Sequence, residues 1–160
     1  MGLAYATNNR GACHMRADPY ESDFNTTEIE GKAAIVKNSQ DEISFIDSSG
    51  LCLFPGGCGW TLSDYLELVD GACEGTWDMD RLKQTGERIW NLERQFNVMA
   101  GRSKAADTRP KRILEEPAEV GIGKGLVCRL GEMLPEYYEL RGWDEEGRPK
   151  ADTLARLGLN

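Results

Sequence analysis

The stretch of this sequence best suited to chemistry is DSSGLC, residues 47–52, in which Asp47 and Cys52 are five residues apart. The residues between them favour a turn, because serine hydroxyls bond back to the backbone and Gly50 can adopt a positive φ at little cost. A turn of this kind can hold both side chains on one side of the backbone. A carboxylate accepts paired hydrogen bonds from a heterocycle, and a thiolate is the usual ligand of an iron–sulfur cluster. Asp47 and Cys52 are therefore candidate cofactor ligands.

The same hexapeptide is also compatible with a purely structural role. The D-x-x-G-x-C pattern is short, and short motifs match many unrelated sequences. Cys52 lies between Leu51 and Leu53. A cysteine in such surroundings can be a buried thiol that behaves as a small apolar side chain.

A second segment with chemical potential, ATNNRGACHMRA at residues 6–17, contains the only histidine of the chain, His14. An imidazole titrates near neutral pH and can donate or accept a proton, whereas the alternative is a hydrogen-bonded structural histidine. The segment also supplies two cations, Arg10 and Arg16. Cys13 beside His14 is a poor nucleophile–base pair, because adjacent side chains rarely point at one atom and no third group is evident.

Together with three further segments, these two resemble the aldehyde ferredoxin oxidoreductase family. The further segments are GERIWNLERQFNVMAG at 86–101, DTRPKRILEEP at 107–117 and EYYELRGWDEEGRPKADTLARLGL at 136–159. The resemblance runs through nearly the whole chain in the order of the family. Members of the family oxidise aldehydes to carboxylic acids with a tungsten bis-pterin (tungstopterin) cofactor and a [4Fe-4S] cluster, and pass the electrons to ferredoxin.

The resemblance implies roles for the residues of the DSSGLC turn. Asp47 would contact one pterin, and Cys52 would be a metal ligand that binds the cluster. Leu51 and Leu53 would line the same cofactor-binding site.

The resemblance also implies roles for the segment around the histidine. Arg10 and Arg16 would bind the pterin and phosphate groups of the cofactor, although some members of the family carry lysine at the position of Arg16. His14 would be the catalytic histidine close to the metal and would act there as a proton donor or acceptor.

The chain departs from the family in what it lacks. Members have a long, β-rich N-terminal portion under the pterins and a C-x-x-C-x-x-x-C run that supplies the other cluster thiolates. Some also have an iron-binding E-x-x-H segment. None of these is present, so residues 1–160 resemble the last helical domain of the enzyme, either expressed alone or encoded by a separate short gene. We expect this chain alone to bind neither cofactor.

Two functions follow as hypotheses. The chain is part of an aldehyde-oxidising enzyme with tungsten or molybdenum, and its partners are the N-terminal domains, ferredoxin and an aldehyde. Alternatively, it is a non-catalytic helical module that docks onto a partner subunit carrying the remaining cofactor ligands. On its own, such a module would expose the Leu51–Phe54 stretch or bury it in a contact with a second copy, and would leave Cys52 reactive, with Cys128 or Cys73 protected.

Composition excludes several classes of protein. The net charge of −8 and the pI near 4.8 argue against nucleic-acid binding, which needs a basic face. The sequence contains no apolar run of about 18 residues and no apolar signal segment in residues 1–10, which predicts a cytoplasmic protein. Five cysteines without a C-x-x-C pair predict reduced, mostly buried thiols and no zinc site.

Helical periodicity and the scarcity of alternating patterns predict an all-α fold, an orthogonal bundle of five or six helices. Residues 1–24 have turn signals and are predicted to be irregular, and 102–125 should form a polar loop. The predicted helices are 28–47 with Thr26 or Thr27 as its cap, one that Thr61 and Asp64 cap, 78–99, 130–140 with Pro135 in its first turn, and 151–157.

The longest predicted helix, 78–99, has an apolar stripe that we expect to be buried throughout. Leu82, Ile89 and Phe96 repeat every seven residues, and the positions between them are filled by Gly86, Leu92 and Met99. Gly86 costs helix propensity, which close packing of a neighbouring helix would explain. The charged residues of this helix are predicted to form a solvated face without a role in the site: Arg81, Lys83, Glu87, Arg88, Glu93 and Arg94.

Overall fold

A computed structural model describes residues 1–160 and consists of helices without a strand, which confirms the all-α prediction. The α-helices are α1 Gly2–Thr7, α2 Tyr20–Asn25, α3 Lys32–Ser49, α4 Leu62–Ala72, α5 Met79–Met99, α6 Lys111–Glu115, α7 Leu130–Arg141 and α8 Ala151–Leu157. Three short 3₁₀ turns complete the fold: η1 His14–Arg16, η2 Phe54–Cys58 and η3 Lys104–Ala106. None of the helices combines the length and the apolar character that crossing a membrane requires.

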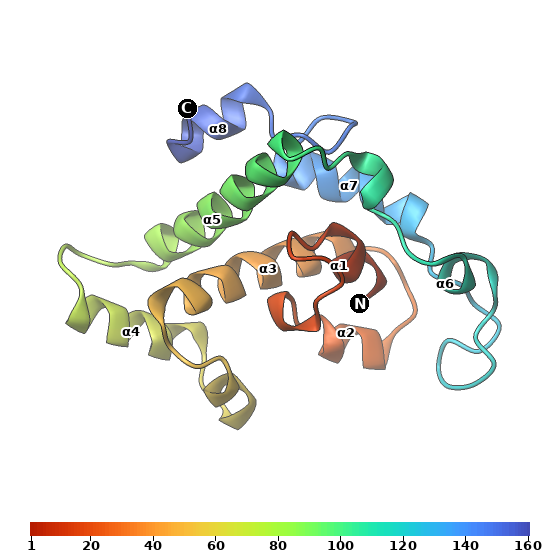
Figure 1. Cartoon of the computed structure of the whole chain (residues 1–160). Coiled ribbons are helices and arrows are strands. Elements are labelled where there is room, and N and C mark those ends of the chain that lie inside the picture. The colour runs from red at the N-terminus through yellow and green to blue at the C-terminus, as the bar shows by residue number, and fades with distance from the viewer.

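Helix α3 is the centre of the arrangement (Figure 1). It packs most extensively against α5, which lies alongside it, and next against α7. Helix α1 contacts both α3 and α7, while α8 lies on α5 and α4 contacts α3 and α5. The predicted close approach at Gly86 is confirmed, because a Cβ atom there would lie 2.0 Å from the carbonyl oxygen of Asp41 on α3.

The apolar interior has two parts. The larger cluster joins α1, α3 and α7 around Trp90 and Trp143, both almost fully buried. The smaller cluster lies where the C-terminal end of α3 meets α4 and α5, and its buried members are Phe45, Ile46, Tyr65, Val69 and Leu82. It supports the turn that follows α3.

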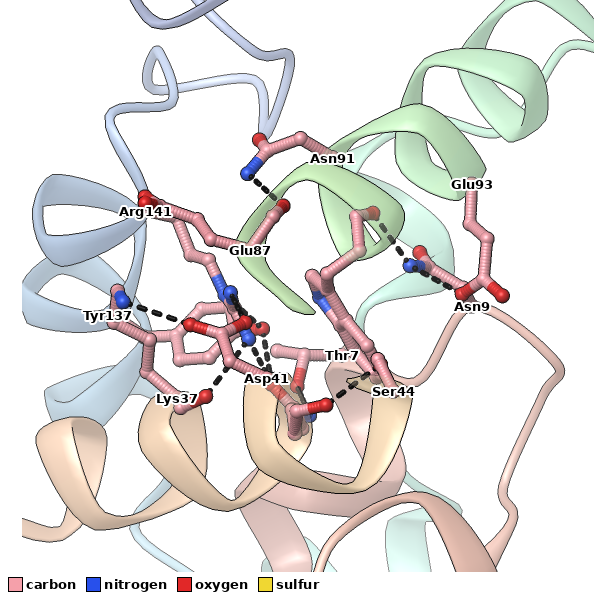
Figure 2. A network of polar contacts seen from close by, with 12 residues as sticks. Thr7, Asn9, Lys37, Asp41, Ser44, Glu87, Asn91, Glu93, Tyr137 and Arg141 are labelled. Carbon is pink, nitrogen blue, oxygen red and sulfur yellow. Dashed lines mark hydrogen bonds and ion pairs between the residues drawn. The ribbon is translucent and has the colours of Figure 1, made fainter. Parts of the chain in front are cut away.

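A buried polar network ties α7 to α3 (Figure 2). The guanidinium group of Arg141 is fully buried; it donates hydrogen bonds to the carboxylate of Asp41 and, at 2.8 Å, to Oε1 of Gln40. Tyr137 donates its hydroxyl proton to the same Gln40 oxygen at 2.6 Å. Lys37 makes a second ion pair with Asp41 at 2.9 Å. A buried charge is tolerated only with partners of this kind, so the network fixes how the two helices meet.

The predicted apolar stripe of α5 is wrong in its C-terminal half. Phe96 is 71% exposed and Met99 is 82% exposed, and Leu92 is exposed as well. The buried face instead follows a four-residue spacing, with Leu82, Gly86, Trp90, Asn91 and Arg94. The reason is that α3 contacts α5 at Gly86, and that the C-terminal end of this face is buried by polar contacts of Asn91 with Trp143 and of Arg94 with Asp107.

The prediction of a solvated charged face on α5 is also wrong for Arg94. Its guanidinium group is fully buried and makes a two-pronged ion pair with Asp107, with N–O distances of 2.9 and 2.6 Å. Arg102 and Tyr138 hydrogen-bond the same carboxylate. Segment 102–125, predicted as a polar loop, therefore anchors α5 through Asp107 and also contains η3 and α6.

The start of the chain is more regular than predicted, because α1 and α2 are too short to show periodicity in the sequence. Helix α3 begins at Lys32 rather than near Glu28. The Thr26 hydroxyl accepts the Glu28 N–H at 3.0 Å in a local turn, and Gly31 has a φ of 72° that no helical residue adopts. Further on, Pro135 lies in the interior of α7 rather than in its first turn.

The cysteines are free, as predicted, but most are not buried. Cys52, Cys58 and Cys73 are exposed, and Cys13 and Cys128 are half-buried. The expected protection of Cys73 is therefore wrong, because it lies at the exposed C-terminal end of α4. For the other cysteine expected to resist, Cys128, burial raises the pKa of its thiol.

Candidate functional site

The DSSGLC turn is built by the end of α3 and by one tyrosine of α4. Gly50 closes α3 with a φ of 76°, the positive value expected of it. The hydroxyl of Tyr65 lies 3.1 Å from the carbonyl oxygens of both Cys52 and Leu53, and it accepts the N–H of Gly56 at 3.2 Å. These contacts fix the backbone of the turn while the Cys52 thiol remains exposed.

Leu51 and Leu53 are half-buried and pack against the smaller apolar cluster. Each therefore has a structural partner inside the chain, and only the remaining part of its surface is open to a ligand. Their predicted place in a cofactor site stays a prediction.

Arg16 is the most constrained residue of the site. It is only 5% exposed, and its guanidinium group hydrogen-bonds both carboxylate oxygens of Glu93 at 3.1 Å and Ser44 Oγ at 2.9 Å. Its Nε lies 3.5 Å from a carboxylate oxygen of Asp47. The group also lies over the ring of Trp90, 5.5 Å from its centroid. Arg16 thus joins the N-terminal segment to α3 and α5 and holds Asp47 beside it.

Arg10 and His14 are exposed, in contrast to Arg16. The Nη2 atom of Arg10 lies 3.1 Å from Cys13 Sγ. This hydrogen bond, together with the charges of Asp47 and Glu93, raises the pKa of Arg10. No hydrogen bond of the His14 side chain is present in the chain.

The structure therefore brings part of the predicted set together. Arg16 and Asp47 form an ion pair, and the charge of Asp47 contributes to the raised pKa of Arg10. The side chains of His14 and Cys52 make no hydrogen bond or ion pair with the other members, so their meeting at one ligand remains a prediction.

Sequence reasoning missed Glu93, which completes this cluster. It accepts hydrogen bonds from Arg16 and, at 3.4 Å, from Asn9, as Figure 2 shows for the asparagine. The same Asn9 amide donates to the carbonyl oxygen of Trp90 at 3.0 Å. The sequence predicts a solvated face for Glu93, and no local pattern signals its ion pair, because Arg16 lies 77 residues away in the chain.

The residues fit an iron–sulfur cluster and a pterin only as part of a larger ligand set. The chain contains no group of three or more histidine, cysteine or acidic side chains that could hold a metal ion. Cys52 is a single exposed thiol, which suits one of the four thiolates that a [4Fe-4S] cluster requires. The Asp47 carboxylate is 40% exposed and suits a hydrogen-bonding ligand.

Comparisons with known proteins show that this chain matches one part of longer proteins. The tungsten-containing aldehyde ferredoxin oxidoreductase of Pyrococcus horikoshii is 44% identical over 168 aligned positions, which cover 99% of this chain and 27% of the relative. The enzymes of Pyrococcus furiosus and Thermococcus kodakarensis are 43% identical with the same coverage. The chain thus spans about a quarter of the length of these relatives.

A solved structure, the active site complex BamBC of benzoyl coenzyme A reductase with 1,5-dienoyl-CoA, superimposes with a TM-score of 0.66. The superposition covers 84% of this chain and 20% of the matched chain of that complex, at 22% sequence identity, which shows a shared fold. A family model described as aldehyde ferredoxin oxidoreductase, domains 2 & 3, matches residues 1–159. The chain therefore belongs to the aldehyde ferredoxin oxidoreductase family.

Proposed function

We propose that this chain is the C-terminal helical domain of an enzyme that oxidises an aldehyde to a carboxylic acid and delivers two electrons to ferredoxin. The observation that carries the proposal is that Asp47, near the end of α3, and Cys52, in the turn that follows, are both exposed in a chain that matches the family along nearly its whole length. The tungsten or molybdenum bis-pterin and the [4Fe-4S] cluster would supply the redox chemistry when bound.

In this proposal the residues of the turn have separate tasks. The Asp47 carboxylate accepts hydrogen bonds from ring N–H groups of a pterin, since an ionised carboxylate is an acceptor only. The Cys52 thiolate contributes one cluster ligand, and Tyr65 holds its backbone in place. Leu51 and Leu53 keep water from the apolar side of the turn.

The N-terminal segment would supply charge and a proton carrier. Arg10 has an exposed guanidinium group that can pair with the phosphate groups of the cofactor. Both terminal nitrogens of Arg16 already hydrogen-bond Glu93 or Ser44, and its Nε faces Asp47 at 3.5 Å, so we assign it to holding Asp47 rather than to phosphate. His14 would donate or accept a proton at an imidazole nitrogen near the substrate.

A Cys52→Ser substitution tests the proposal in the enzyme assembled with its remaining polypeptide. We expect the iron content per enzyme to fall and aldehyde-dependent reduction of a viologen dye to be lost. Cys73→Ser, a change at another exposed cysteine, should leave both unchanged. Full iron content and full activity in the Cys52→Ser enzyme would remove Cys52 from the cluster.

The second candidate function is a helical module that docks onto a subunit carrying the other ligands, without chemistry of its own. The observation that favours it is that this chain presents one exposed thiol in the turn and no three-residue metal site. Metal analysis and an ultraviolet–visible spectrum separate the two. Both candidates give a brown, metal-containing assembly with that subunit, and they differ in the effect of Cys52→Ser. The assembly keeps its iron content and spectrum if the chain is a module without chemistry of its own, whereas it loses cluster iron if the chain is the enzyme domain.

A further inference from the structure

The C-terminal half of α5 carries an unpartnered apolar surface, the α5 stripe, formed by Leu92, Phe96 and Met99. These residues lie at positions i, i+4 and i+7, so their side chains share one face of the helix. Phe96 and Met99 are among the most exposed large apolar side chains of the chain. The seven-residue repeat that includes Leu82 and Ile89 predicts burial for this face, and within this chain only its first half is covered.

The α5 stripe borders the candidate site. A hollow of about 480 Å³ beside it is lined by Asn9, Arg10, Leu92, Glu93, Phe96 and Asn97. Asn97 donates a hydrogen bond to the carbonyl oxygen of Asn9 at 2.8 Å, which holds the N-terminal segment against α5. A polypeptide that packs over Arg10 therefore also contacts Leu92 and Phe96.

A second copy of this chain does not suit the stripe. Stable dimers bury about 800 Å² on each partner, and three side chains on one helix are a small part of that area. A helix pair through the stripe would contain a single heptad, whereas coiled coils need about three or more. The relatives, in contrast, contain a much larger polypeptide, because this chain spans only 27% of their length.

We propose that the α5 stripe is a docking surface for the rest of the oxidoreductase polypeptide, which places apolar side chains on Leu92, Phe96 and Met99 and closes over Arg10. This inference rests on the proposed function. It adds the surface by which the remaining polypeptide is held next to the site. Burial of the stripe then excludes water from the Arg10 side of the cofactor ligands.

The test uses the tagged full chain co-expressed with the remaining polypeptide of the oxidoreductase, and measures how much of that polypeptide is retained on the tag after washing. We expect the double substitution Phe96→Asn and Met99→Asn to lower retention by about tenfold, since buried aromatic residues dominate such interfaces. The matched control, Val120→Asn with Ile122→Asn, changes two other exposed apolar residues and should retain the wild-type amount. Circular-dichroism melts should be alike for all three chains.

A second measurement needs no substitution. Hydrogen peroxide should convert Met99 to its sulfoxide rapidly in the chain alone and slowly in the assembly, as read by mass spectrometry. Equal retention by the double variant, or equal oxidation of Met99 in both forms, overturns the docking surface alone. A wild-type chain that retains no polypeptide overturns the proposed function with it. A dimer of this chain that the double substitution dissociates assigns the stripe to a second copy instead.

Discussion

Gly86 of α5 lies directly on the backbone of Asp41 of α3, so that a Cβ atom at Gly86 would be 2.0 Å from the Asp41 carbonyl oxygen. A backbone oxygen inside a helix cannot rotate away as a side chain can. Gly86→Ala must therefore separate the two helices, although alanine itself improves helix propensity by about 1 kcal/mol. We expect a net loss of about 3 kcal/mol in the free energy of unfolding, measured from urea titrations.

Gly131→Ala is the matched control for this prediction. Gly131 lies in α7, and an added Cβ would meet no atom within 4 Å. The control should stabilise the chain by about 0.5 kcal/mol through the lower entropy of the unfolded state. Equal effects of the two substitutions would show that α3 and α5 do not pack at Gly86.

The buried ion pair between Arg141 and Asp41 gives a second prediction. Arg141→Met keeps an apolar side chain of similar length but leaves Asp41 with Lys37 as its remaining cation and leaves Gln40 without its charged donor. Breaking one side of a buried pair costs about 3 to 5 kcal/mol, which a thermal or urea unfolding curve will show. Arg148→Met, which removes an ion pair to Asp144 from a side chain that is 58% exposed, should cost less than about 1 kcal/mol.

Much of the fold could be predicted from local pattern. The capping box of Thr61 with Asp64, the extent of α5 and the close approach at Gly86 follow from short-range rules, and the structure confirms them. The predicted burial of the apolar stripe on α5 is wrong in its C-terminal half. Periodicity indicates that a helix face needs a partner, but not whether that partner lies in the same chain. No contact within this chain buries Phe96, so the packing of this chain does not explain why an apolar residue lies there.

The candidate site was predictable only in part. Gly50 and the exposed Cys52 turn follow from local sequence, whereas the environment of Arg16 does not. Its partners Ser44 and Glu93 are 28 and 77 residues away in the chain. Such contacts depend on how α3 and α5 cross, which no spacing in the sequence encodes.

The buried carboxylate of Asp107 makes stability depend on pH. Burial alone would raise its pKa, but the hydrogen bonds and charge of Arg94, with those of Tyr138 and Arg102, outweigh burial and hold the pKa of Asp107 below its ordinary value. The unfolded chain then takes up a proton first as the pH falls. The stabilising contribution of Asp107 is therefore complete above about pH 4, the unfolded value, and is lost toward the lower pKa of the folded state.

Asp107→Asn isolates this contribution. The variant should be less stable than the wild type at pH 6, and the difference between the two should narrow as the pH falls below about 4. Urea titrations across this range measure both. A difference that stays constant from pH 6 to the acid limit would mean that ionisation of Asp107 does not stabilise the fold.

The five cysteines should differ in their rates of alkylation by iodoacetamide. Cys52, Cys58 and Cys73 are exposed and should react readily, whereas Cys128 is half-buried and burial raises the pKa of its thiol. Since the thiolate is the reacting form, Cys128 should be the slowest. Mass spectrometry of a time course resolves each site.

Cys13 is the informative member of this series. Burial would raise its pKa, but the hydrogen bond from Arg10 at 3.1 Å and that from the Met15 N–H lower the pKa below its ordinary value. In Arg10→Gln the fraction of Cys13 that is thiolate at pH 7 should fall.

The higher basicity of the remaining thiolate recovers only part of the lost reaction rate, because nucleophilicity rises about 0.4 to 0.5 logarithmic units per pKa unit. Alkylation of Cys13 should therefore slow several-fold, and its rate profile should shift to higher pH, while Arg148→Gln leaves both unchanged. A Cys13 rate that does not respond to Arg10→Gln would show that Arg10 does not bind the thiolate in solution.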